Sequence, residues 1–436
     1  MMRYTVFLLG FLTFAAWAQD PPLPTAAEHK HMGVATCASS TCHGSVQPFR
    51  DSNVMQNEFA VWQNEDPHAG AYKILEDPQS ERIAKNLGIG DPTEADMCLD
   101  CHADNVPAEK RGEKFQLSDG VGCEGCHGGS EQWLSSHASG TATHEENLDL
   151  GLYPTEDPVA RGKLCLSCHL GNKDQMITHR IMGAGHPRLA FELDNFTWMF
   201  AHFEVDDDYI ARKGDIDGAR DWGVGQGVAA LTQLETLLDD DSGWSGIFPE
   251  LVLFDCHACH NTMFPAKWVP RRSTGLGPGV VRYNDANLLM FRHVVASVDQ
   301  DLASTLQQQT RDLHRATGRG RGETEAAARA LVGTVDNALN QLRSKQFDGS
   351  TLQAIFASLV RDGERGEFRD YATAEQAALA VDTVLLAFES SGVIGAEEYE
   401  RLRTQAEGLY NATENEDAYQ QGRFVSALKS LNAAMN

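Results

Sequence analysis

Ten cysteines fall into five closely spaced pairs, and a histidine follows the second cysteine of every pair. Four pairs have the spacing C-x-x-C-H, which is the attachment signature of c-type haem. The two thiols bond to the haem, and the histidine becomes the proximal ligand of the iron. In chain order the sets are Cys37/Cys42 with His43, Cys98/Cys101 with His102, Cys123/Cys126 with His127, Cys165/Cys168 with His169, and Cys256/Cys259 with His260. The pattern predicts five covalently bound haem c groups.

Zinc sites and disulfides are the alternative uses of paired cysteines. C-x-x-C pairs build many zinc sites, and disulfides form in exported proteins. Neither use requires a histidine after every second cysteine. A chain with this content of Cys and His is expected to contain about 0.01 C-x-x-C-H motifs by chance. Haem attachment is therefore the preferred interpretation of all five pairs, including the first pair with its longer C-x4-C-H spacing.

Eleven of the sixteen histidines remain after the proximal ligands are assigned. A second imidazole on an iron gives a six-coordinate haem that carries electrons, whereas an open position admits a substrate. Three histidines, His29, His144 and His314, are expected to face solvent. The candidates for distal iron ligands are His68, His137, His179, His186, His202 and His293.

The first residues have the organisation of a secretory signal. Arg3 supplies a positive charge, a short apolar run follows, and Ala16-Trp17-Ala18 is a cleavage site of the A-x-A type. The apolar run is too short to cross a membrane comfortably. The segment predicts export to the periplasm or to the exterior, with cleavage near Ala18.

The charge of the chain restricts its partners. Acidic residues outnumber basic ones by 62 to 36, which gives a net charge of −26. Nucleic-acid binding requires a basic surface, so this function is excluded. The prediction is a redox partner protein with a basic docking surface, such as a membrane complex that oxidises quinol or a periplasmic reductase.

From Asp285 onward the spacing of apolar residues becomes that of helices, and we expect a mainly α protein with two regions. After the signal segment 1–18, residues 19–284 should form a pentahaem cytochrome c domain with little regular structure packed around its haems. Residues 285–436 should form an α-helical bundle. Apolar residues from Leu288 to Leu306 predict one helix at its start. Capping boxes at Ser350/Gln353 and Thr373/Gln376 predict two later helix starts. The bundle could form a homo-oligomer or dock a partner.

The region of about residues 33–205 resembles the cytochrome c-554 family of multihaem cytochromes. Its members are periplasmic electron carriers whose haems stack in parallel and perpendicular pairs. The resemblance implies that His68 ligates the third haem and His137 the first. It also implies that the haem on Cys98/Cys101 lacks a distal ligand. The residues that carry it are Trp62, Asp66-Pro67-His68-Ala69, Cys98 to His102, Gly120 to Gly128 with His137, and Cys165 to Leu170.

The sequence departs from this family in the spacing of its first motif, in its added fifth motif and in its helical C-terminal region. Pentahaem nitrite reductases have the same number of haems, but they use a lysine at the catalytic haem. No C-x-x-C-K motif occurs in this chain.

Our leading prediction is an exported pentahaem cytochrome that transfers electrons along closely packed, mostly bis-His haems, with no catalytic residue assigned. The alternative is a multihaem oxidoreductase with one five-coordinate haem that acts on a small nitrogen or sulfur compound. In that case the open haem would be the one on Cys98/Cys101 or on Cys256/Cys259. A third class is a structural subunit of a larger redox assembly.

Overall fold

The computed structural model describes residues 21–48, 55–246, 248–260, 271, 273–276, 280 and 282–435. The predicted signal segment, residues 1–18, lies outside this part. Within the described residues, none of the helices combines the length and the apolar character that a membrane crossing requires.

Among the described residues, short helices and loops make up the chain before Gly218 and the segment from Trp244 to His260. Their starts follow familiar capping chemistry: before α7, Asp157 accepts hydrogen bonds from the backbone of Val159 and Ala160, and Pro158 occupies the first turn. The helices are α1 (Glu58–Asn64), α2 (Pro78–Leu87), α3 (Asp96–His102), α4 (Cys123–His127), α5 (Leu134–Ser139), α6 (His144–Asp149), α7 (Pro158–His169), α8 (His179–Ala184), α9 (Leu193–Met199), α10 (Asp207–Lys213) and α12 (Cys256–Cys259).

Single 3-10 turns and one small antiparallel pair of strands complete this region. The strands are β1 (Trp244–Ser245) and β2 (Phe248–Pro249). The 3-10 turns are η1 (Val34–Thr36), η2 (Pro67–Gly70), η3 (Lys73–Glu76), η4 (Ala108–Lys110), η5 (Leu117–Asp119) and η6 (Leu251–Leu253).

Apolar side chains make only two small buried clusters outside the main core of the described residues. One cluster is Leu75, Leu99 and Ala103, and the other is centred on Leu87 and Ile181. Such small clusters bury too little apolar surface to offset the entropy lost when a chain is ordered. The region that carries the first four motifs therefore fits a fold that depends on another large apolar group for its core.

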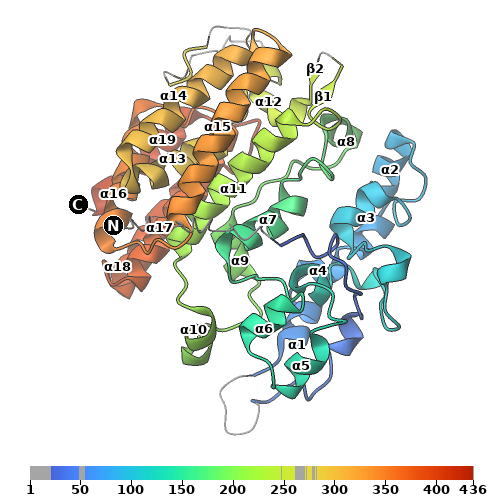
Figure 1. The fold of residues 1–436 in the computed structure, drawn as a ribbon. Coiled ribbons are helices and arrows are strands. Elements are labelled where there is room, and N and C mark those ends of the chain that lie inside the picture. Colours follow the sequence, from blue (N-terminus) through green and yellow to red (C-terminus); the bar gives the residue numbers. More distant parts are fainter. Residues whose placement is uncertain are drawn as a thin grey trace, which may run out of the picture.

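The main hydrophobic core lies in the long helices. These helices are α11 (Gly218–Leu238), α13 (Ala286–Val298), α14 (Gln300–Thr317), α15 (Arg321–Leu342), α16 (Gly349–Arg365), α17 (Tyr371–Ser390), α18 (Ala396–Ala412) and α19 (Gln421–Met435). In Figure 1 helices α13 to α19 lie on one side of the molecule, the short helices α1 to α6 lie on the other, and α11 runs between them. The mainly α fold is confirmed.

Helix α11 belongs to the bundle core although its sequence lies between the fourth and fifth motifs. It packs against α13, α15, α7 and α9. Its residues are buried on nearly every side, including Trp222, Val228 and Leu234. The apolar core of the bundle therefore begins well before residue 285. The sequence analysis placed α11 in the haem region because it lies between two haem motifs. Its burial on nearly every side places it in the core of the bundle.

Three helix ends differ from the expected positions because an aspartate caps each new helix. The single helix expected from Leu288 to Leu306 is two helices, since Asp299 is extended and accepts a hydrogen bond from the backbone of Leu302. The cap of α16 is Asp348 rather than Ser350, and the cap of α17 is Asp370 rather than Thr373. Each aspartate oxygen accepts from a backbone N–H of the first turn, which is the usual role of an N-cap.

Candidate haem-binding sites

Each C-x-x-C-H motif lies at the end of a short helix. His102, His127 and His169 are the last residues of α3, α4 and α7, and His260 directly follows α12. Residues three and four positions apart share one face of a helix. The second thiol of each pair and the histidine beside it therefore lie one turn after the first thiol, as attachment to a single haem requires.

The first motif differs from the other four at Cys42. Its two cysteines lie five positions apart, about 1.4 turns of an α-helix, so a helix would direct their thiols to different faces. Cys42 lies instead in a turn, where its backbone N–H donates to the carbonyl of Ser39 and that of His43 donates to the carbonyl of Cys37. The Cys42 thiol lies 4.0 Å from the hydroxyl of Thr41.

This turn gives the backbone conformation of the C-x4-C-H variant that the sequence analysis had set apart from the other four motifs. The longer spacing is the physical reason, because the chain must fold back before the histidine can approach the first cysteine. The hydrogen bond from His43 to Cys37, at 3.1 Å, closes the loop in this way. Attachment of a haem through Cys42 stays a prediction.

A second imidazole faces the proximal histidine in four of the five motifs. Two imidazoles that bind opposite sides of one metal through bonds of about 2 Å have ring centroids about 6 Å apart. The separations in the structure have this value. The pairs are His43 with His137 at 5.9 Å, His127 with His202 at 6.3 Å, His169 with His68 at 5.8 Å, and His260 with His179 at 6.1 Å.

The remaining proximal histidine, His102, has His186 as its neighbour. Burial lowers the pKa of His102, and the nearby His186 lowers it further. His186 follows Gly185, whose φ of 121° turns the chain directly after α8. A non-glycine residue adopts this backbone conformation only with strain. The resemblance implied that the haem on Cys98/Cys101 lacks a distal ligand, but His186 is close to this site.

Hydrogen bonds at Nδ1 would leave the other ring nitrogen, Nε2, available to an iron at four of the candidate histidines. The Nδ1–H of His102 donates to the carbonyl of Ala71 (3.0 Å), and that of His186 donates to the carbonyl of Pro187 (2.8 Å). Carboxylates are the partners of His43 and His68. Glu58 Oε2 lies 2.9 Å from His43 Nδ1, and Asp66 Oδ1 lies 2.8 Å from His68 Nδ1. Metal-bound histidines in proteins almost always have such a partner, because it fixes the tautomer and the orientation of the ring.

Three histidines outside these pairs hydrogen-bond a protein acceptor through Nε2. This nitrogen is therefore not available to a metal, unlike that of the ligand candidates. His144 Nε2 lies 2.8 Å from Glu156 Oε1, and His314 Nε2 lies 3.0 Å from Asp285 Oδ2. His31 uses both ring nitrogens, on Asp104 and on the carbonyl of Pro24. His314 is fully buried, so the expectation that it faces solvent is wrong.

The prediction of His293 as a candidate distal ligand is corrected by its position in the fold. It lies in the bundle on α13, with 1% of its surface exposed. Its Nδ1 lies 2.9 Å from the hydroxyl of Ser358 on α16, and its ring contacts Phe368. The sequence analysis listed this histidine among those left after the proximal ligands were assigned, whereas its burial on α13 places it in the helical core.

The assignment of His68 to the third motif is also corrected. His68 faces His169, which belongs to the fourth motif, and His202 faces the histidine of the third motif. His137 faces the first motif, as the resemblance implied. The pairing depends on which distant segments meet in space, so motif order along the chain does not determine it.

Burial keeps the central imidazoles neutral. It lowers the pKa of His127 to about 3 and that of His169 to about 4. A neutral ring has a free lone pair, and a metal needs that lone pair. At His43 and His68 the hydrogen-bonded carboxylates act in the opposite direction and raise the pKa. The donor set, the ring separations and the Nδ1 partners together fit a covalently bound haem at each motif.

Contacts between thiols of different motifs show which sites are neighbours. None of the ten cysteines, all of which lie among the described residues, forms a disulfide. The thiol of Cys37 in the first motif interacts with Cys123 in the third, and the thiol of Cys101 in the second interacts with Cys168 in the fourth. The pKa of Cys126 is raised by burial and also by the nearby Cys165. The first site therefore adjoins the third, the third adjoins the fourth, and the fourth adjoins the second.

The fifth motif is held by ion pairs to the bundle. Asp255 caps α12, and Arg282 lies 2.8 Å from Asp255 and 2.8 Å from Asp370 at the start of α17. Arg188, two residues after His186, lies 2.7 Å from Glu375 of α17 and 3.2 Å from Glu416. The sequence analysis missed these partners, as it missed Glu58. Only Asp66 left a local signal, since it stands two residues before His68.

A family model described as cytochrome c554 and c-prime matches residues 36–128. Comparison with curated proteins gave no match, and comparison with solved structures gave none. The matched segment carries the first three motifs and also His68. Together with the motif geometry, the match supports covalently bound haem and a place among proteins that transfer electrons. The chain is thus similar to the multihaem c-type cytochromes.

Proposed function

We propose that the protein is an exported pentahaem cytochrome that passes electrons between redox partners through bis-His haems. The observation that carries this proposal is that each proximal histidine has a second imidazole beside it. A haem held by two imidazoles supplies one-electron chemistry and offers no position to a substrate. The paired histidines would hold the haem iron, and Glu58 and Asp66 orient the rings of His43 and His68.

The neighbouring sites suggest an order for the electron path. Thiol contacts connect the first, third, fourth and second motifs in that order. Helix α8 then connects the second site to the fifth, because His179 at its start faces His260 and His186 after its end adjoins His102. A helix rises about 1.5 Å per residue, so the two distal histidines are near neighbours. The path would run from the first site to the fifth, with one end at each edge of the region.

Export and the nature of the partner follow from the sequence. The apolar N-terminal segment with its A-x-A site would direct the chain to the periplasm or to the exterior, with cleavage near Ala18. A net charge of −26 favours a partner with a basic surface, such as a membrane complex that oxidises quinol. The attraction between the acidic protein and a basic partner should weaken as the salt concentration rises.

The oxidoreductase alternative requires an open iron position. The sequence singled out the haems on Cys98/Cys101 and Cys256/Cys259 for this role. His186 adjoins the first of these sites and His179 the second. This arrangement favours the electron carrier over the enzyme.

Binding of carbon monoxide tests the proposal. The reduced, fully haem-loaded protein should give no carbon monoxide spectrum, because every iron has two protein ligands. The variant His186→Ala should bind carbon monoxide at one haem. His144→Ala should not, since Nε2 of His144 is hydrogen-bonded to Glu156 and is not available to an iron. Binding by the unchanged protein at one haem would support the enzyme instead.

A further inference from the structure

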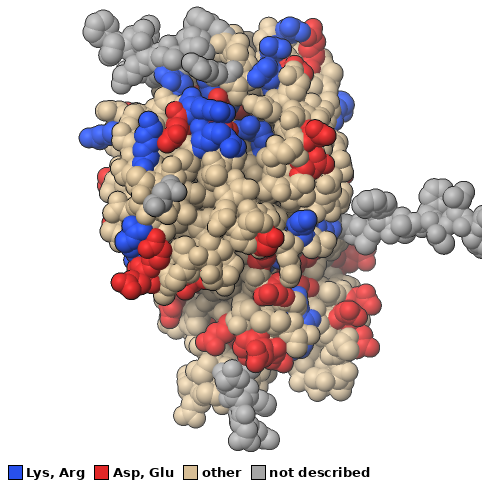
Figure 2. Space-filling view, turned by 90° about the vertical axis from the view of Figure 1, so that its left-hand side faces the viewer, with Lys and Arg blue, Asp and Glu red and all other residues tan. Residues whose placement is uncertain are grey.

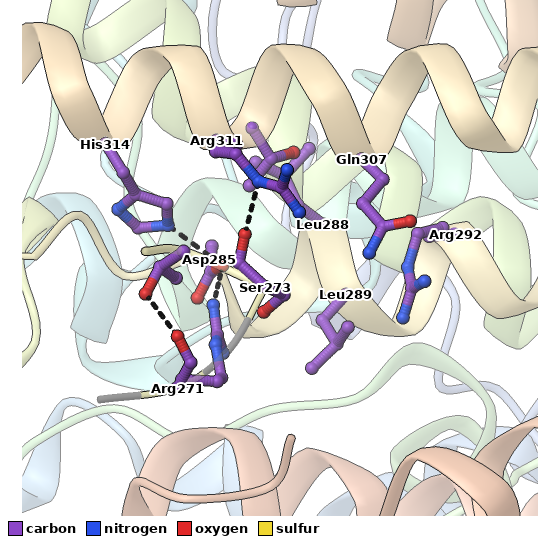
Figure 3. A pocket seen from close by; sticks show the side chains of 11 residues that line it. Arg271, Ser273, Asp285, Leu288, Leu289, Arg292, Gln307, Arg311 and His314 are labelled. Carbon is purple, nitrogen blue, oxygen red and sulfur yellow. Dashed lines mark hydrogen bonds and ion pairs between the residues drawn. The ribbon is translucent and has the colours of Figure 1, made fainter. Parts of the chain in front are cut away.

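A hollow of about 230 Å³ lies between α13, α14 and α16, remote from the haem motifs in the sequence. Its walls include Arg292, His293, Gln307, Ser358, Arg361 and Arg365. Arg292 and Gln307 also line a smaller adjoining cavity, into which Arg271, Arg311 and His314 point (Figure 3). The two spaces share Arg292 and Gln307 in their walls, and together they are called the recess.

The recess is basic in a strongly acidic protein. Five arginines line it, whereas its carboxylates are Asp285, Asp362 and Glu367. The ion pairs Arg271–Asp285 and Arg292–Asp362 cancel, which leaves Arg311, Arg361 and Arg365 against Glu367. Figure 2 views the molecule from the side where α14 and α16 lie, and Lys and Arg side chains gather on the upper part of this face. The recess therefore attracts anions although the chain carries a charge of −26.

Buried nitrogen atoms face the recess without a hydrogen-bond acceptor among the described residues. Nε2 of His293 has none, and the nearest carboxylate oxygen, on Asp362, is 3.8 Å away. Nε and Nη1 of Arg271, which is 3% exposed, instead lie 3.9 and 3.8 Å from carboxylate oxygens of Glu367 and Asp370 that also have no hydrogen-bond partner in the described part of the chain. Buried polar atoms in proteins are nearly always hydrogen-bonded. An acceptor oxygen of a ligand would satisfy Nε2 of His293.

Two exposed arginines stand at the mouth of the recess. Arg361 donates to the hydroxyl of Ser358 at 3.1 Å and meets no carboxylate in the part of the chain that the structure describes. Arg365 lies one turn further along α16 and lines the same hollow. A guanidinium group binds phosphate or carboxylate with two parallel hydrogen bonds. The two side chains are thus available to an entering anion.

We propose that this recess binds a small polyanion, a molecule with two or more phosphate or carboxylate groups. Arg361 and Arg365 hold the outer group, and His293 donates from the floor. The hollow is smaller than the pockets of about 300 Å³ or more that hold drug-sized ligands. Its size suits a compact anion rather than a protein segment. The inference does not depend on the proposed electron transfer.

Calorimetric titration of the haem-loaded full chain tests the proposal, with pyrophosphate and citrate as separate probes. At least one probe should bind saturably at one site, and the stronger of the two identifies phosphate or carboxylate as the preferred chemistry. The double variant Arg361→Gln/Arg365→Gln should bind that probe tenfold or more weakly. A tenfold loss corresponds to about 1.4 kcal/mol.

The matched control is Arg315→Gln/Arg319→Gln, which removes two exposed charges at the end of α14, away from the recess. It should leave the affinity within about twofold. If the first double variant does not fold, Arg361→Gln alone should still weaken binding several-fold. The proposal is overturned if neither probe binds, if both double variants lose affinity equally, or if only a long acidic polypeptide such as polyglutamate binds.

Discussion

At the scale of single residues, four of the candidate ligand histidines share one hydrogen-bond pattern. His43, His68, His102 and His186 use Nδ1 for a protein acceptor, which would leave Nε2 for an iron. The acceptors differ, because two are carboxylates and two are carbonyl groups. A carboxylate makes the imidazole a stronger donor to the metal. The haems should therefore differ in potential even though their axial ligands are the same.

The carboxylate at the first haem gives a direct prediction. Replacement of Glu58 by Gln removes the negative charge 2.9 Å from His43 Nδ1, and the potential of this haem should rise. A tenfold loss of preference for the ferric state corresponds to about 59 mV. Spectroelectrochemical titration measures the shift, and Glu65→Gln, an exposed residue on the same segment, is the control. A fall in potential, or equal shifts in both variants, would contradict the role of Glu58.

A buried carboxyl group at α9 gives a prediction for pH. Burial raises the pKa of Asp194 to about 7, and its carboxylate oxygen accepts from Trp198 Nε1 at 3.2 Å. The folded chain thus holds a proton that the unfolded chain, with a pKa of about 3.9, has lost. Stability therefore falls as the pH rises from about 4 to about 7.

The variant Asp194→Asn keeps an oxygen for Trp198 and removes the charge. Its melting temperature should exceed that of the unchanged protein by a margin that grows from about pH 5 to about pH 8. Thermal unfolding followed by far-UV circular dichroism measures this margin. A margin that stays constant over this range would show that the carboxyl group does not titrate as described.

At the scale of elements, α11 connects the haem region to the bundle, and its glycines set the packing distance. A Cβ atom at Gly227 would lie 2.5 Å from Phe291 Cε2 and 2.7 Å from Leu339 Cδ2. Both neighbours are buried in the core. The small residue lets α13 and α15 approach α11 closely.

Replacement of Gly227 by Ala should therefore destabilise the bundle by about 1–3 kcal/mol through overpacking. Gly333 on α15 is the matched control, because a Cβ atom there meets nothing within 4 Å. Gly333→Ala should stabilise the fold by up to about 1 kcal/mol, since alanine favours a helix. Chemical denaturation of both variants gives the two values. If Gly227→Ala is as stable as Gly333→Ala, the close packing described for α11 is wrong.

Local signals in the sequence predicted the haem motifs and the main helices, but they did not predict the contacts between distant segments. Cys98 to His102 is a local pattern, and so is the apolar spacing in α16. His293 and His202 both stand among apolar residues, and the chain alone does not distinguish a core histidine from a ligand. Likewise, the approach of His68 to His169 crosses a long stretch of chain.

The sequence patterns also did not predict the exact positions of helix starts or the turn at the first motif. The caps were misplaced by two or three residues because Asp348 and Asp370 stand before the serine and threonine that were chosen. At Cys42 the histidine that follows suggested the same attachment as in the other motifs, whereas the extra residues between the cysteines replace the helix by a turn. A pattern of residue types does not by itself give the backbone conformation that carries it.

At the scale of the whole molecule, the fifth motif lies where the haem region meets the bundle (Figure 1). Arg282 forms ion pairs with both Asp255 and Asp370, and Arg188 forms one with Glu375. Two half-buried arginines therefore connect the haem region to the bundle. Removal of one partner of a buried ion pair leaves the other charge uncompensated. The bundle thus fixes the position of the last site in the proposed electron path.

The central claim is that two imidazoles hold every iron. Low-temperature EPR spectroscopy of the oxidised, fully haem-loaded protein tests it most directly, because low-spin and high-spin ferric haem give different signals. The account predicts that all haems are low-spin and that nitrite or hydroxylamine leaves the spectrum unchanged. A high-spin haem whose signal shifts when either compound is added would contradict the account and would indicate an enzyme with an open iron position.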